Sequence, residues 1–124
     1  MRALLQALVL CAVLLPGIKA WATEQTLDWN NPGEVLQYRS CGCADSCWSA
    51  ELYKTSQLKH QKPTGTPIAS LRCDCAKLWA KTATQKTETA YEANCDRFDT
   101  AEKFTLIPRE IRQLTAPTNP KVSP

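Results

Sequence analysis

The segment IASLRCDCAKLW, residues 68–79, carries the clearest strand pattern in the chain. Alternation places Leu71, Cys73 and Cys75 on one face and Arg72 and Asp74 on the other. That two-residue period predicts a half-buried β-strand. It also sets two cysteines on one face, so this segment links the fold to the chemistry of the cysteines.

The neighbouring segments extend the β pattern in both directions. Residues 34–43 (EVLQYRSCGC) and residues 87–95 (TETAYEANC) alternate in the same way and predict two more strands. Residues 47–58 are ambiguous. The alternation of Trp48, Ala50 and Leu52 favours a strand, while a capping residue at 45 or 46 would place Trp48 and Leu52 one helical turn apart. The interpretation favoured here is a strand.

Helical signals are confined to the last third of the chain. Residues 99–102 are predicted to open one short helix, and Pro108 suits the first turn of a second, over residues 109–114. The predicted fold is therefore mainly β, with α+β possible: a small antiparallel sheet of about four strands, with one or two short helices, stapled by disulfides. The residues expected to form the core are Trp29, Leu36, Tyr38, Trp48, Leu52, Leu71, Leu78, Trp79, Tyr91, Phe98, Phe104, Leu106, Ile107 and Ile111.

The N-terminal segment has the pattern of an export signal. A weakly basic start precedes an apolar run over residues 3–15, and Ala20-Trp21-Ala22 has the small residues that a signal peptidase recognises. We expect residues 1–22 to be a cleaved signal peptide, with cleavage after Ala20 as the second choice. The apolar run is shorter than the roughly 20 residues that span a bilayer. No stable membrane span is therefore expected after cleavage.

The remaining chain is expected to form a single domain. Residues 23–33 read as a polar N-terminal segment, residues 34–114 as the disulfide-stapled domain, and residues 115–124 as a proline-rich, disordered tail. Loss of Arg2 and Lys19 takes the Lys and Arg count from 15 to 13 against 12 Asp and Glu, a net charge of +1. The mature protein is thus nearly neutral.

Six cysteines follow the signal segment, and an even count behind an export signal predicts disulfides in an oxidising compartment. They are Cys41, Cys43, Cys47, Cys73, Cys75 and Cys95. If the two CxC segments lie on neighbouring antiparallel strands, two bridges can form side by side. The favoured pairing is Cys41–Cys75, Cys43–Cys73 and Cys47–Cys95, one of 15 that six cysteines allow.

A metal site is the alternative use of the same thiols. Zn²⁺ and Cu(I) both favour thiolate ligands, and two thiol clusters are present. The ligand set would be Cys41, Cys43, Cys47, Cys73 and Cys75. The compartment weighs against this alternative, since exported thiols tend to oxidise. The main expectation is that the protein holds no metal and no cofactor.

Catalysis is not expected, because the residues that carry it are scarce. The single histidine, His60, lies in a polar segment between Lys59 and Gln61. Acid pairs occur at 88 and 92 and at 96 and 99, where a surface location is expected, and four glycines form no phosphate-binding loop. No catalytic residue is therefore assigned, and the protein is expected not to be an enzyme.

A binding role remains, and the charge pattern suggests where it lies. Residues 54–86 hold seven Lys and Arg against one acid. The polar segment 53–66 is the candidate partner surface, through Tyr53, Lys54, Lys59, His60 and Lys62.

The expected function is that of a periplasmic or secreted, non-catalytic binding protein or inhibitor in the cell envelope. Its partner would be an unknown protein or an anionic envelope component, and not nucleic acid. A structural component of an envelope assembly is the other alternative.

Overall fold

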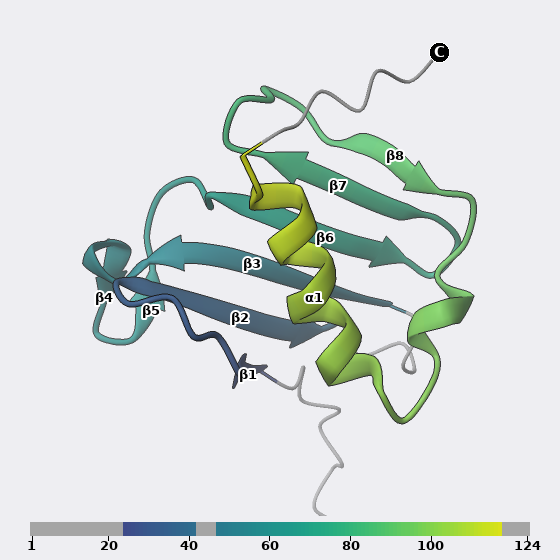
Figure 1. The fold of residues 1–124 in the computed structure, drawn as a ribbon, viewed down its shortest axis with the longest axis horizontal. Helices are drawn as coiled ribbons and strands as arrows, with labels where there is room; N and C mark the ends of the chain where they lie inside the picture. Colours follow the sequence, from purple (N-terminus) through teal and green to yellow (C-terminus); the bar gives the residue numbers. More distant parts are fainter. Residues whose placement is uncertain (1–23, 42–46, 118–124) are drawn as a thin grey trace, which may run out of the picture.

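The computed structural model describes residues 24–41 and 47–117. Six antiparallel strands form the main sheet, in the spatial order β1-β2-β3-β6-β7-β8 (Figure 1). These strands are β1 (Glu24–Leu27), β2 (Glu34–Ser40), β3 (Cys47–Lys54), β6 (Ala69–Asp74), β7 (Leu78–Thr82) and β8 (Thr89–Glu92). The prediction of a mainly β fold built on an antiparallel sheet is confirmed, with six strands rather than about four.

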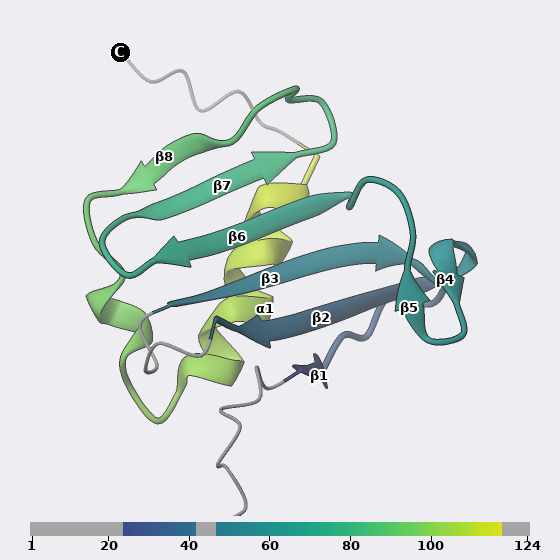
Figure 2. The ribbon, with the colours of Figure 1, turned by 180° about the vertical axis from the view of Figure 1, so that it is seen from behind.

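Shorter elements complete the described part of the chain. A two-stranded hairpin, β4 (Leu58–Lys59) and β5 (Lys62–Pro63), follows the 3₁₀ turn η1 (Thr55–Gln57). A second 3₁₀ turn, η2 (Asp96–Phe98), precedes the helix α1 (Lys103–Thr115). Figure 1 shows α1 lying across one face of the main sheet, and Figure 2 shows the opposite face, which α1 does not cover.

The core lies between α1 and the sheet, as strand alternation dictates. On β3, Trp48, Ala50 and Leu52 are fully buried. Ala50 and Leu52 each lie opposite a buried residue on both neighbouring strands, and Trp48 lies opposite the buried Cys73 on β6. The helix contributes Ile107 and Ile111, one turn apart and both fully buried. Burying each such aliphatic side chain contributes about 1.5–3 kcal/mol, so this two-layer contact is the main stabilising feature.

The strand predicted over residues 68–79 is wrong in one respect: it is a hairpin. β6 ends at Asp74, whose Oδ1 accepts the backbone N–H of Ala76 at 3.1 Å and of Lys77 at 2.8 Å. This local bond offers the backbone an alternative to the ladder and reverses the chain. Cys75 therefore lies in a turn, and it does not share the core-facing side of Cys73.

The described residues hold one helix, within the predicted one or two, but its bounds differ from both expected segments, because residues 103–115 form a single continuous helix. Pro108 lies inside α1 and not in a first turn. Its ring carries no N–H, so the carbonyl of Phe104 lacks its usual partner four residues on. Packing of the Ile107 and Ile111 side chains against the sheet offsets that loss.

Two other sequence boundaries change. Residues 24–27, assigned to a polar N-terminal segment, form the edge strand β1 and pair with β2 from Glu24↔Arg39 to Leu27↔Leu36. The ambiguous segment after Cys47 is a strand up to Lys54, as favoured, and continues into η1 and β4. The predicted signal peptide, and all but the first three residues of the predicted tail, lie outside the described residues.

Candidate functional site

The candidate site lies on the sheet face that α1 leaves open. Residues that alternate with the core positions point to this face, and they are polar or only partly buried: Gln37 and Arg39 on β2, and Ser49 and Glu51 on β3. In Figure 2 the β4–β5 hairpin stands at the end of β2 and β3. Side chains of this face and of the hairpin line one pocket.

The hairpin is a defined structure, although its sequence reads as a long polar loop. His60 and Gln61 connect β4 to β5 with φ angles of 51° and 62°. Positive φ at both central residues is what a type I′ turn requires, and that turn matches the twist of a two-residue hairpin. Such positions favour glycine or asparagine, so this turn stores backbone strain.

Gln57 holds the base of the hairpin. Its Nε2 donates to the Thr66 carbonyl at 2.9 Å, and its Oε1 accepts the Lys54 N–H at 2.9 Å. The hydroxyl and the N–H of Thr64 both donate to the Gln57 carbonyl, each at 2.8 Å. These bonds offset the strain of the turn and fix the direction in which the hairpin projects.

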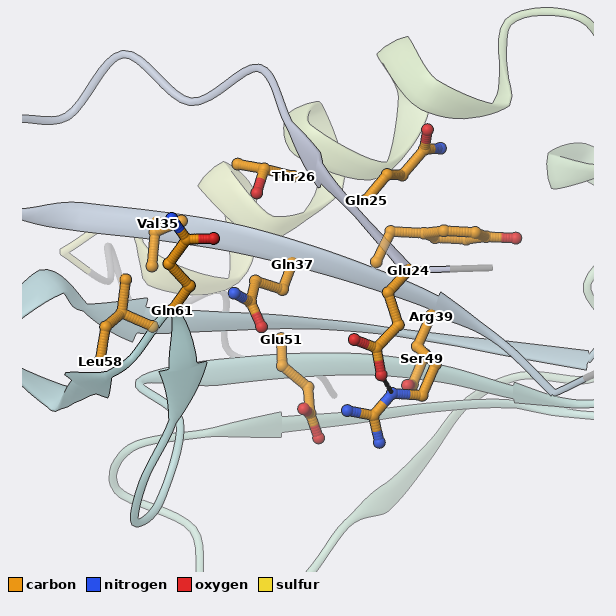
Figure 3. A pocket seen from close by; sticks show the side chains of 11 residues that line it. Glu24, Gln25, Thr26, Val35, Gln37, Arg39, Ser49, Glu51, Leu58 and Gln61 are labelled. Atoms are coloured by element: carbon orange, nitrogen blue, oxygen red, sulfur yellow. Dashed lines mark ion pairs between the residues drawn. The ribbon is translucent and has the colours of Figure 1, made fainter. Parts of the chain in front are cut away.

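A pocket of about 470 Å³ opens between the hairpin and the sheet. Figure 3 shows Leu58, Gln61 and Val35 grouped together, Glu24 and Arg39 away from them, and Gln37 and Glu51 between. Its lining residues come from β1, β2, β3 and the hairpin: Glu24, Gln25, Thr26, Val35, Gln37, Tyr38, Arg39, Ser49, Glu51, Leu58 and Gln61. The lining offers both hydrogen-bond donors and acceptors to an occupant.

The charged residues of the pocket take part in two polar contacts. Arg39 Nε lies 2.9 Å from Glu24 Oε1, but both side chains are more than half exposed, so a partner can displace this ion pair at little cost. The Tyr53 hydroxyl donates to Glu51 Oε2 at 2.7 Å. Burial, together with this bond to Glu51, raises the pKa of Tyr53 well above its ordinary value, so the phenol stays neutral at physiological pH.

The structure exposes four of the five residues predicted as a partner surface. Lys54, Lys59, His60 and Lys62 are exposed, whereas Tyr53 is only 6% exposed and is not presented to a partner. Within residues 24–41 and 47–117, no carboxylate forms an ion pair with any of these three lysines. The register also sets Lys59 directly opposite Lys62.

The cysteines correct the predicted pairing. Cys73 forms a disulfide with Cys95, so the expected bridges Cys43–Cys73 and Cys47–Cys95 are both wrong. The reason is that Cys73 faces the core, where the loop before η2 brings Cys95, while Cys75 lies in the turn. Cys41, Cys47 and Cys75 are outside this bridge, and the expected bridge Cys41–Cys75 is not formed. Cys43 lies outside the described residues.

The alternative metal site loses one of its ligands to the same bridge. A disulfide sulfur is not a thiolate, so Cys73 cannot bind metal in this structure. Across the two described ranges, no group of three or more His, Cys, Asp or Glu has an arrangement that would hold a metal ion.

Two of the four acidic residues considered for catalysis, Glu88 and Glu92, are held in ion pairs. Glu88 accepts two hydrogen bonds to its Oε2 and one to its Oε1 from Arg72, and Glu92 accepts from Arg97 at 2.6 Å. Arg97 also pairs with the buried Glu110 of α1 at 2.9 Å. Arg72 thus joins β6 to the segment before β8, and Arg97 of η2 joins β8 to α1. These ion pairs connect elements of the fold.

No protein-family model, curated protein or solved structure matches the chain. Within the described ranges, no helix is both long enough and apolar enough to span a bilayer. The case for a function therefore depends on the hairpin, the pocket and the cysteines themselves.

Proposed function

We propose that this chain is a periplasmic or secreted, non-catalytic binding protein or inhibitor, and that the β4–β5 hairpin and its adjoining pocket hold the partner. The observation that carries the proposal is the pair Lys59 and Lys62, which lie directly opposite each other and form no ion pair with a described carboxylate. Like charges at opposed strand positions repel. An anionic group from a partner would relieve that repulsion, so the hairpin favours an acidic partner.

The stiffness of the hairpin supports the same proposal. A flexible loop would lose conformational entropy on binding, whereas a turn already held by Gln57 and Thr64 loses little. The two strained residues at its tip, His60 and Gln61, are consistent with a functional segment, since strain of this kind gathers at binding sites.

The pocket favours a polypeptide among anionic partners. Amide side chains of Gln37 and Gln61 present donors and acceptors, and the Glu51 carboxylate presents further acceptors for backbone N–H groups. A peptide backbone uses both kinds of group, and acidic side chains beside it would meet the lysines. An acidic protein is therefore the partner we propose, with an anionic envelope component as the competing outcome.

Export is supported by the oxidised Cys73–Cys95 pair. Disulfides persist in secreted proteins and in the bacterial periplasm and are rare in the cytosol.

The proposed function is non-catalytic because of where the candidate catalytic residues lie. His60 lies at an exposed turn, and the acids considered at 88 and 92 are held by arginines.

A matched pair of double variants tests the proposal. Poly-L-glutamate serves as the acidic polypeptide probe and anionic phospholipid vesicles as the envelope probe, both at low and at high salt. Lys59→Gln/Lys62→Gln should weaken poly-L-glutamate binding at least about tenfold, an effect of ~1.4 kcal/mol. Lys77→Gln/Lys86→Gln changes the net charge equally, at the far side of the sheet, and should leave binding within about twofold.

Three outcomes would overturn the proposed site. Equal losses in both double variants would mean that only net charge matters. No loss in either would remove the hairpin from the interface. Tighter, hairpin-dependent binding to the vesicles than to poly-L-glutamate would replace the acidic protein by an envelope component.

A further inference from the structure

The start of β3 and the turn between β6 and β7 bring two cysteine side chains together. The register pairs Cys47 with Asp74, so Cys75 follows the last paired position. The side chains of Cys47 and Cys75 are hydrogen-bonded to each other. Cys73 does not compete for either thiol, because it is buried and already bonded to Cys95.

The backbone holds Cys75 in this place at a cost. Its φ is 72°, in the left-handed region that costs a residue with a Cβ roughly 1–2 kcal/mol. Glycine or asparagine would suit the turn better. The Asp74 carboxylate fixes the turn by accepting from the backbone of Ala76 and Lys77 and from Trp79 Nε1 at 2.8 Å. A cysteine at a strained, well-fixed position beside a second thiol points to a role for the pair.

We propose that Cys47 and Cys75 close a second disulfide, which joins the start of β3 to the β6–β7 turn. This inference is independent of the proposed binding function. The oxidant is a low-molecular-weight or protein disulfide, acting by exchange. The exposed Cys75, as thiolate, attacks one sulfur of the reagent and releases its first thiolate. Cys47, as thiolate, then attacks the Cys75 sulfur and releases the second.

The step balances. Cys47 and Cys75 together lose two protons and two electrons, and the reagent's disulfide bond is reduced to two thiols.

The groups around Cys75 set the pH dependence of this reaction. The hydrogen bond with Cys47, followed by burial and the charges of Cys47 and Asp74, raises the pKa of Cys75 above its ordinary value. Closure should therefore be faster in mildly alkaline buffer than in neutral buffer, because the thiolate is the nucleophile.

A double digest of the exported chain tests the proposal, because the sequence separates every cysteine in question. The protein is alkylated without reduction, then cut with trypsin and with a protease that cleaves before aspartate. Cys47 then lies in residues 45–54 and Cys75 in residues 74–77, while Cys73 is isolated and Cys95 ends residues 87–95. Cys41 and Cys43 stay together in residues 40–44.

The expected result is residues 45–54 linked to residues 74–77, lighter by two hydrogens than the two free peptides. Two results would overturn the proposal: Cys47 and Cys75 both alkylated while the Cys73–Cys95 link is intact, or residues 45–54 linked to residues 40–44. Cys41→Ser is the control, because it removes the competing exposed thiol. The 45–54 to 74–77 link should persist in this variant at full yield, and its loss would contradict the pairing.

Discussion

Lys59 and Lys62 lie directly opposite each other across the β4–β5 hairpin. Both side chains are exposed, and the hairpin that carries them is joined to the sheet through Gln57. Two positive charges thus lie opposite each other on the hairpin that also contributes Leu58 and Gln61 to the pocket, and this arrangement disfavours the isolated domain and suits an acidic partner.

Reversing one of these charges should stabilise the chain. Lys62→Glu converts a repulsive cross-strand pair into an attractive one, and we expect the free energy of unfolding to rise by about 0.5 kcal/mol. Urea unfolding followed by tryptophan fluorescence measures it. Lys77→Glu is the matched control, and an equal gain there would assign the effect to net charge and not to the pair.

The Cys73–Cys95 bridge should carry a large share of the stability. It closes a loop of sequence separation 22, and removing such a bridge with Cys73→Ala/Cys95→Ala should lower the free energy of unfolding by about 3 kcal/mol. Thermal and urea unfolding measure the loss. Cys41→Ala, an exposed position outside this bridge, should change it by less than about 0.5 kcal/mol. A loss of similar size in both variants would contradict the prediction.

Replacing Gly33 should destabilise the fold only through the strained backbone conformation that a side chain would have to adopt there. Its φ is +79°, yet a Cβ built there meets nothing within 4 Å, so crowding plays no part. We expect Gly33→Ala to lower the free energy of unfolding by about 1–2 kcal/mol. Gly33→Asn should cost less, since asparagine tolerates the left-handed region. If both variants unfold at the same urea concentration as the wild type, the turn before β2 does not require that conformation.

The tyrosines make stability depend on alkaline pH. Burial, followed by the hydrogen bond to Glu110, raises the pKa of Tyr91 from 10.0 to about 12. Between these values the unfolded chain has lost the phenol proton and the folded chain has kept it, so stability falls as pH rises. Tyr91→Phe should flatten that slope. The absorbance of tyrosinate, titrated in the wild type and in the variant, identifies the group, and an unchanged slope would contradict the assignment.

Strand alternation made much of the sheet predictable from the sequence. Leu36, Trp48, Leu52 and Leu71 were expected in the core and are fully buried, because a two-residue period assigns a face without knowledge of partners. Two residues expected in the core are largely exposed: Tyr91, placed by alternation, is 37% exposed, and Phe104, placed by its apolar character, is 45% exposed. Tyr91 lies on the edge strand β8, and Phe104 lies on α1, where its ring packs edge-on against Tyr38 of β2 with centroids 5.0 Å apart and keeps its other side in solvent.

The predictions that failed, or were not made, concern features that depend on contacts between residues distant in the sequence. Nothing local to Cys95 shows that it will reach Cys73, and the Asp74 turn competes with a continuous strand that its sequence fits equally well. The pocket was not predicted, since its lining comes from β1, β2, β3 and the hairpin. The local signal of an open face was the set of polar positions that alternate with buried ones, 37 and 39 on β2 and 49 and 51 on β3.

Mapping the bound surface at the level of single amides tests the proposed function most directly. The mature chain, labelled with ¹⁵N, is titrated with an acidic peptide while amide chemical shifts are recorded. We predict that the largest changes fall on Lys59, Gln61 and Lys62 and on Arg39 of the pocket. Changes centred on Lys77 and Lys86, or spread evenly over every lysine, would contradict the assignment of the hairpin as the partner surface.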